Sequence, residues 1–262
     1  MRNEPARAGR SALECYRTEV RERRRAFTRC AAATFASAGL GWLALRLGGD
    51  AGNAAFAGAI VLLVSALWMR PSPDPERWLR GAAGEVATAR MLECLPDRKW
   101  VVLHDLAVPG SRSNVDHLVI GPTGVWVVDS KTKRGRARRG LGGVRFGDHR
   151  LDTGPVRFEA SVVEERLGVR VRAVVAVHGA GLPRRGVRSG GVRVVPAGSL
   201  VGLLTRPGWP PWRRRCRRSE VRRLARLAES QLAPARCSSP YGGWYRSKRD
   251  PREPSRQVDG RR

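Results

Sequence analysis

The chain has 262 residues, enough for one domain of ordinary size with additional segments, and carries a formal net charge of +27 at pH 7. This charge is unusual for an enzyme of small-molecule metabolism and favours polyanionic neighbours such as nucleic acid or anionic lipid. Nearly all of its 50 basic residues are arginines, so a general bias toward arginine accounts for part of the charge.

The cysteine pattern argues against two kinds of site. The chain has five cysteines, widely spaced and without a Cys-x-x-Cys pair. Their spacing therefore predicts neither a zinc site nor a disulfide framework, and we expect free thiols in a reducing compartment.

The first part of the chain reads as a basic segment followed by two apolar ones. Residues 1–29 are polar and basic, and residues 30–47 and 54–69 are apolar, with a turn between them. Both apolar segments are close to the length that a helix needs to cross a bilayer, so we predict a two-helix transmembrane hairpin over residues 30–70. A soluble pair of core helices rich in Ala and Gly is the alternative. Arginines on both flanks predict a multi-pass protein of the cell membrane, with the N-terminus and the C-terminal domain in the cytoplasm.

A Pro-rich linker over residues 71–78 precedes the predicted main domain, residues 79–233. Helical and strand patterns alternate there, which predicts an α/β domain with a mixed sheet flanked by helices. We expect helices at 77–95, 157–167 and 219–232, and strands at 100–104, 115–120, 125–131, 171–177 and 192–195. Ser219 is expected to cap the last helix. Residues 234–262, rich in Arg, Ser, Pro and Gly, predict a disordered basic tail.

Two of these strands bring acidic residues together. If residues 121–124 close an antiparallel hairpin, Ile120 faces Val125 and Asp116 lies opposite Asp129. Opposed like charges destabilise a sheet, whereas a divalent cation would satisfy both carboxylates. Lys131 shares the face of Asp129 and could lie beside a scissile phosphate. A solvated strand end is the alternative reading.

Four separated motifs resemble the nuclease-related domain (NERD) family, which is related to the PD-(D/E)xK nucleases. They are Gly-Ala-Ala-Gly-Glu at 81–85, Val-Asp-His at 115–117, Gly-Pro-Thr-Gly-Val at 121–125 and Asp-Ser-Lys at 129–131. The resemblance spans about residues 79–180 and implies a restriction-endonuclease-like fold, here preceded by the transmembrane hairpin. It implies that Asp116, Asp129 and Glu85 bind Mg²⁺ or Mn²⁺ and that Lys131 acts with them in phosphodiester hydrolysis. His117 is expected on the opposite face of the sheet, in a supporting role.

The chain departs from the family pattern at two places. The family usually has glutamate where this chain has Asp129, and it has a polar residue, often glutamine, on a later helix. Here Glu159 and Glu164 are loose substitutes for that residue.

Basic residues follow the predicted site directly. Lys133, Arg134, Arg136, Arg138 and Arg139 are expected to bind the backbone of DNA or RNA from a flexible loop. A second basic run, residues 212–218, joins tryptophan to arginine and suits single strands or anionic lipid.

Three functions remain open from the sequence. The first is a membrane-anchored, Mg²⁺-dependent nuclease, and the second is an inactive nucleic-acid-binding module on the same fold. The third is a protein that interacts with anionic lipid alone.

Overall fold

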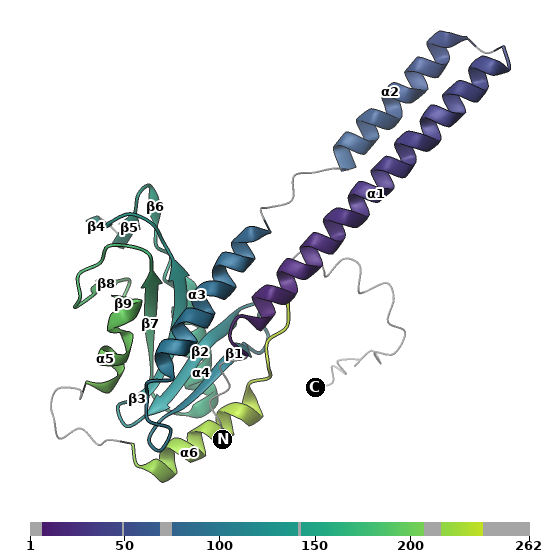
Figure 1. Ribbon diagram of the computed structural model, residues 1–262. Helices are drawn as coiled ribbons and strands as arrows, with labels where there is room; N and C mark the ends of the chain where they lie inside the picture. The colour runs from purple at the N-terminus through teal and green to yellow at the C-terminus, as the bar shows by residue number, and fades with distance from the viewer. Residues whose placement is uncertain (1–6, 49, 69–74, 141–142, 207–215, 238–262) are drawn as a thin grey trace, which may run out of the picture. The chain divides into compact units, whose positions relative to one another are not determined.

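The computed structural model describes residues 7–48, 50–68, 75–140, 143–206 and 216–237 (Figure 1). The chain divides into two compact units: Met1–Cys15 with Arg77–Ser238, and Tyr16–Glu76 with Ser239–Arg262. Residues 71–74 of the predicted linker, residues 212–215 of the second basic run and residues 238–262 of the predicted tail lie outside the described residues.

The first unit is built on a six-stranded mixed sheet of strand order β1-β2-β3-β7-β9-β8. Strands β1, β2 and β3 are antiparallel, β7 and β9 run parallel to β3, and β8 is antiparallel to β9. The strands are β1 Val101–Ala107, β2 Asn114–Gly121, β3 Gly124–Thr132, β7 Val171–His178, β8 Val187–Ser189 and β9 Val192–Pro196. A separate three-stranded sheet consists of β4 Ala137–Gly140, β5 Gly143–Phe146 and β6 His149–Arg150.

Helices cover both faces of the six-stranded sheet (Figure 1). They are α3 Glu76–Leu92, α4 Gly154–Leu167, α5 Leu200–Thr205 and α6 Arg218–Gln231, with a short 3-10 turn, Ala197–Ser199, before α5. One apolar core joins the sheet to α3 and α5 and includes Val128, whereas the other joins it to α4 and α6 and includes Val127. Successive side chains on a strand point to opposite faces, so this division fixes the face of every residue on β3.

The predicted hairpin is confirmed, with Ile120 paired to Val125. The tight turn is covered by Trp100, whose ring lies 2.0 Å from where a Cβ on Gly121 would stand, so only glycine fits there. The prediction of Ser219 as a cap is wrong, because α6 already begins at Arg218.

The described cysteines are not all free thiols. Cys15 and Cys237 form a disulfide across a sequence separation of 222 residues, whereas Cys30, Cys94 and Cys216 are free. The prediction was wrong for the first pair because residues this far apart in sequence leave no signal in cysteine spacing.

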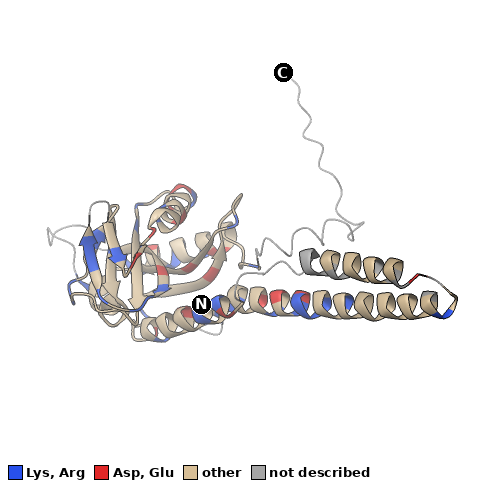
Figure 2. Ribbon diagram, turned by 90° about the horizontal axis from the view of Figure 1, so that it is seen from above, with Lys and Arg blue, Asp and Glu red and all other residues tan. Residues whose placement is uncertain are grey.

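Two helices make up the described part of the second unit. Helix α1, Arg10–Arg46, begins in the first unit and continues into the second, and α2 is Ala51–Trp68. The two run antiparallel in both views (Figures 1 and 2). Charged residues crowd the first half of α1, whereas α2 contains none (Figure 2).

Among the described residues, no helix combines the length and the apolar character needed to cross a bilayer. This finding overturns the predicted transmembrane hairpin at residues 30–70 and the multi-pass localisation, and it leaves the membrane partner without support. The apolar part of α1 is bounded by Arg29 and Arg46 within the same helix. Helix α2 has only 18 residues, and its first half is mostly Ala and Gly.

Candidate active site

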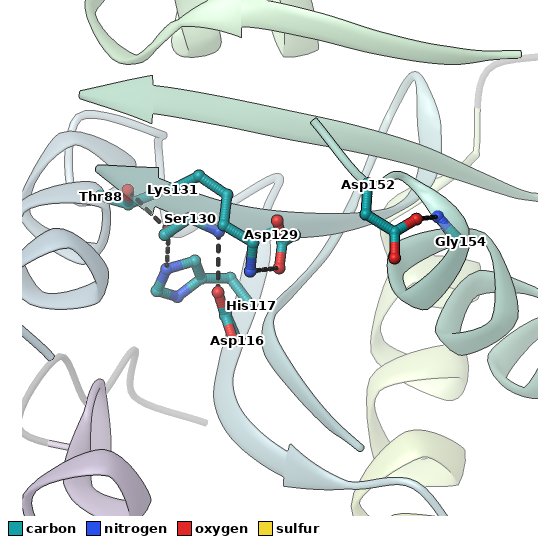
Figure 3. Close-up of polar contacts among 8 residues, drawn as sticks. All are labelled: Thr88, Asp116, His117, Asp129, Ser130, Lys131, Asp152 and Gly154. Atoms are coloured by element: carbon teal, nitrogen blue, oxygen red, sulfur yellow. Dashed lines mark hydrogen bonds and ion pairs between the residues drawn. The ribbon is translucent and has the colours of Figure 1, made fainter. Parts of the chain in front are cut away.

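The site begins where β2 and β3 separate. Their pairing ends at His117 and Val128, and the next residues along the same register are Asp116 and Asp129. At this point the Ser130 backbone N–H donates a 2.7 Å hydrogen bond to Oδ2 of Asp116 (Figure 3). This hydrogen bond fixes the Asp116 carboxylate to the end of β3.

Asp129 and Lys131 form the next part of the site. They lie two and four residues after Val127 on β3, so their side chains share its face of the sheet, the one that packs against α4. The Lys131 ammonium donates to Oδ1 of Asp129 at 2.7 Å (Figure 3). The Asp129 side chain is only 8% exposed, whereas that of Lys131 is 41% exposed, so the ammonium remains open to a ligand from solvent.

Two helices supply further carboxylates. Glu85 comes from α3 and Glu159, which is buried, from α4; both interact electrostatically with Asp116 and Lys131. The sequence singled out Glu85, but it offered Glu159 only as a loose substitute for a family glutamine. Its helical position gave no sign that it faces the ends of β2 and β3.

The charges at this site are unbalanced. Burial and repulsion from Asp129 raise the pKa of Asp116 to about 7. Burial and repulsion from Asp116 raise the pKa of Glu85 to about 9, and burial with repulsion from Asp129 raises that of Glu159 to about 8. Burial also raises the pKa of Asp129, partly offset by Lys131. Four acids thus share one lysine, and the site favours binding a proton or a cation.

Lys131 keeps its charge in this setting. Burial acts to lower its pKa, but the attraction of Asp129 and Asp116 outweighs burial and raises that pKa above its ordinary value. Lys131 is therefore an ammonium throughout the physiological range.

The donor set fits a hard divalent cation. Oε2 of Glu159 is buried without a hydrogen-bond partner among the described residues, although Ser113 hydrogen-bonds the same carboxyl group. All the candidate ligands are carboxylate oxygens, which Mg²⁺ and Mn²⁺ prefer. No three His, Cys, Asp or Glu side chains in the described part stand close enough together to hold a metal ion. A cation held by one or two carboxylates, with water and phosphate completing its shell, is the arrangement that these residues fit.

A buried polar network supports the site from the opposite face of the sheet. The His117 Nε2 atom lies 3.1 Å from Oγ of Ser130, which donates to Oγ1 of Thr88 at 2.9 Å (Figure 3). Thr88 hydrogen-bonds Nε2 of His178, and His104 hydrogen-bonds His117 through their Nδ1 atoms. Burial lowers the pKa of His104 to about 4 and that of His117 well below its ordinary value, so neither carries charge at neutral pH.

The prediction that His117 points to the face of the sheet opposite Asp116 is confirmed, and its contacts show a supporting role. His117 holds Ser130, whose backbone N–H holds Asp116. The sequence did not reveal Thr88, His104 or His178, because they come from separate elements that only the fold brings together. Helix α3 reaches β3 through Gly84, where a Cβ would stand 2.9 Å from Oγ1 of Thr132.

The basic residues after the site are not all in a flexible loop. The prediction was wrong for residues 137–140, which form β4 and pair with β5. Lys133, Arg134, Arg136 and Arg138 line a cavity of about 650 Å³ together with Thr132 and part of β5. Arg139 is not among the lining residues, because successive side chains on β4 point to opposite faces.

Comparison with known proteins agrees with the order of these residues. Residues 80–155 match the nuclease-related domain, NERD. The NERD match includes Glu85, Asp116, Asp129 and Lys131 and ends at the start of α4, so Glu159 lies beyond it.

One relative is an uncharacterized protein of Bacillus anthracis, 40% identical over 62 residues. The aligned segment covers 22% of this chain and 29% of the relative, so the chain matches less than a third of that protein. No solved structure matches the chain. The NERD match supports a nuclease-like function for the first unit.

Proposed function

We propose that the first unit hydrolyses phosphodiester bonds in DNA or RNA with the help of Mg²⁺ or Mn²⁺. Asp116 would hold the ion with Asp129 or Glu85 as a second carboxylate, because no three acidic, histidine or cysteine side chains of the described part stand close enough together to share it. The observation that carries the proposal is the excess of acidic over basic side chains at the end of β3, beside a partly exposed lysine that keeps its charge. Such an excess is stable only with protons or a cation.

Each protein group has a role that follows from its contacts. When bound, the metal ion supplies Lewis acidity toward the phosphodiester. Asp129 orients the Lys131 ammonium, which stabilises negative charge that develops on the phosphate. The Ser130 N–H keeps the Asp116 carboxylate turned toward the end of β3.

The cavity beside β4 fits the role of substrate positioning. Thr132 and Lys133, the two residues after Lys131, line this cavity, so a phosphate backbone bound there would lie next to the end of β3. Contacts of this kind set the position of a nucleic acid without reading its sequence.

A nucleic-acid-binding module without cleavage is the second candidate. Two observations favour it: Asp129 is already paired with Lys131, and the described residues offer no ready group of three metal ligands. Both candidates share the basic cavity and differ only in turnover.

Cleavage assays with the full chain test the proposal. We expect a plasmid, a linear duplex or a single-stranded RNA to be cut in MgCl₂ or MnCl₂, and cutting to stop in EDTA and resume when the ion is restored. Binding without cleavage of any of them would select the second candidate. Neither binding nor cleavage would reject both.

The basic cavity predicts a specific salt dependence. Arg134→Ala and Arg136→Ala should each lower the slope of log Kobs against log salt concentration by about 1, because each substitution removes one phosphate contact. Fluorescence anisotropy with a labelled oligonucleotide in EDTA measures this slope. Arg166→Ala, at an exposed position on α4, is the matched control and should leave the slope unchanged. Equal slopes for all four proteins would remove the cavity from nucleic-acid binding.

A further inference from the structure

Residues 8–15 belong to the first unit; residues 8 and 9 precede α1, and residues 10–15 form its beginning. Ala8, Ala12 and Cys15 are buried. The backbone N–H of Gly9 donates a hydrogen bond to the carboxylate of Glu85. This segment therefore touches one of the acids of the candidate site directly.

Gly9 lies against the helix that carries Glu85. It has a φ of 70°, and a Cβ at this position would stand 3.0 Å from the backbone of Ala82. Ala82 is one turn before Glu85 on α3. Because only glycine allows this approach and this conformation, the contact between the segment and α3 depends on Gly9.

Ser11 anchors the same segment to β1. Its backbone N–H donates to Oδ2 of Asp105 at 2.7 Å, and its hydroxyl donates to Oδ1 at 2.6 Å. Asp105 is buried and has a φ of 54°; no other non-glycine residue in the described part has a positive φ. Such a backbone conformation is strained and persists only where the surroundings enforce it.

The C-terminal end of the described chain meets the same point. The Ala235 N–H donates to the carbonyl oxygen of Asp105, and the Ala107 N–H donates to that of Ala233. Two residues further on, Cys237 forms the disulfide with Cys15. The disulfide thus joins the two segments that converge on Asp105.

We propose that residues 8–15 position Glu85 for metal binding and that the Cys15–Cys237 disulfide holds them in place, which makes metal affinity sensitive to redox state. Reduction by a dithiol breaks the S–S bond and leaves two thiols on the protein, while the dithiol becomes a disulfide. The freed segment then loses the contact that fixes Glu85. This inference rests on the proposed function, because it assigns a role toward the same metal site.

Titration of Mn²⁺ into the full chain, followed by calorimetry, tests the positioning role. Ser11→Ala and Cys15→Ser should each weaken Mn²⁺ binding about tenfold, the lower end of the range for groups that orient metal ligands. Ser11→Thr, which keeps the hydroxyl, should restore affinity. Ser37→Ala and Cys94→Ser are matched controls at a second helical serine and an exposed free cysteine, and they should bind as the wild type does.

Hydrogen exchange supplies a readout that does not need the metal. The amides of Gly9 and Ser11 should exchange faster in Cys15→Ser, and in the wild type after reduction, while the amides of β2 and β3 stay protected. Unchanged Mn²⁺ affinity in Ser11→Ala and Cys15→Ser, with a wild type that binds the ion, would overturn this inference and leave the proposed function standing. A wild type that binds no Mn²⁺ would overturn both.

Discussion

Replacement of Lys131 by alanine is expected to abolish nucleic-acid cleavage. The ammonium is held 2.7 Å from Asp129 and stays charged throughout the physiological range, so it is placed to stabilise charge on the phosphate. Loss of one such electrostatic group lowers turnover by about 100- to 1000-fold. Initial rates of plasmid or RNA cleavage at saturating MgCl₂ measure the effect.

The fold should survive this substitution. Asp129 loses its partner, but burial already raises its pKa, and the carboxyl can take up a proton instead of remaining as an unpaired charge. Circular dichroism and thermal unfolding would establish that the variant is folded. Lys133→Ala, two residues along the chain, is the matched control and should weaken substrate binding without a comparable loss of turnover. Unchanged cleavage by Lys131→Ala would exclude this lysine from the reaction.

The hairpin and its acids were predictable because they depend on local rules. Alternating side chains and a short turn fix which residues share a face, and this was enough to place Ile120 opposite Val125 and His117 on the other face from Lys131. The role of each residue in catalysis remains a prediction, because it depends on chemistry that the arrangement alone does not test.

Features that depend on distant parts of the chain were not predictable. Glu159 reaches the site only because α4 packs across the sheet, and Cys15 meets Cys237 only because residues 8–15 and 233–237 converge on Asp105. The strand at residues 137–140 was missed for a different reason. Its run of arginines and its glycine resemble a loop, and its pairing with β5 decides the structure.

The prediction of a transmembrane hairpin was wrong because the two segments are rich in small side chains. Segment length and flanking arginines were given more weight than the small side chains within the segments. Alanine and glycine bury little apolar surface, so they provide much less transfer free energy than leucine or isoleucine would at the same positions.

The free energy of unfolding of the metal-free protein should fall as pH rises from about 7 to 9, above the range in which the buried, uncharged His104 and His117 have the opposite effect. Asp116, Glu85 and Glu159 have pKa values of about 7, 9 and 8 in the folded chain, raised from ordinary values of 3.8 for Asp and 4.5 for Glu. The folded state therefore binds more protons than the unfolded state in this range. The stabilisation is complete below the unfolded pKa values and is lost as pH passes through the folded ones. The raised pKa of Lys131 stabilises the fold below its ordinary value of 10.5, so it adds a constant amount here.

A divalent cation should oppose the fall in the free energy of unfolding at high pH, because it replaces the protons that neutralise the acids. Mg²⁺ or Mn²⁺ at about 100 times its Kd should add about 2.7 kcal/mol near pH 9 and much less near pH 5, where it competes with bound protons. Urea unfolding at both pH values, with and without the ion, measures the two increments. Asp116→Asn removes a ligand and a charge, so it should weaken both the pH dependence and the effect of the ion. Equal increments at the two pH values would show that the ion binds elsewhere, since only a site made of these acids couples metal binding to their protons.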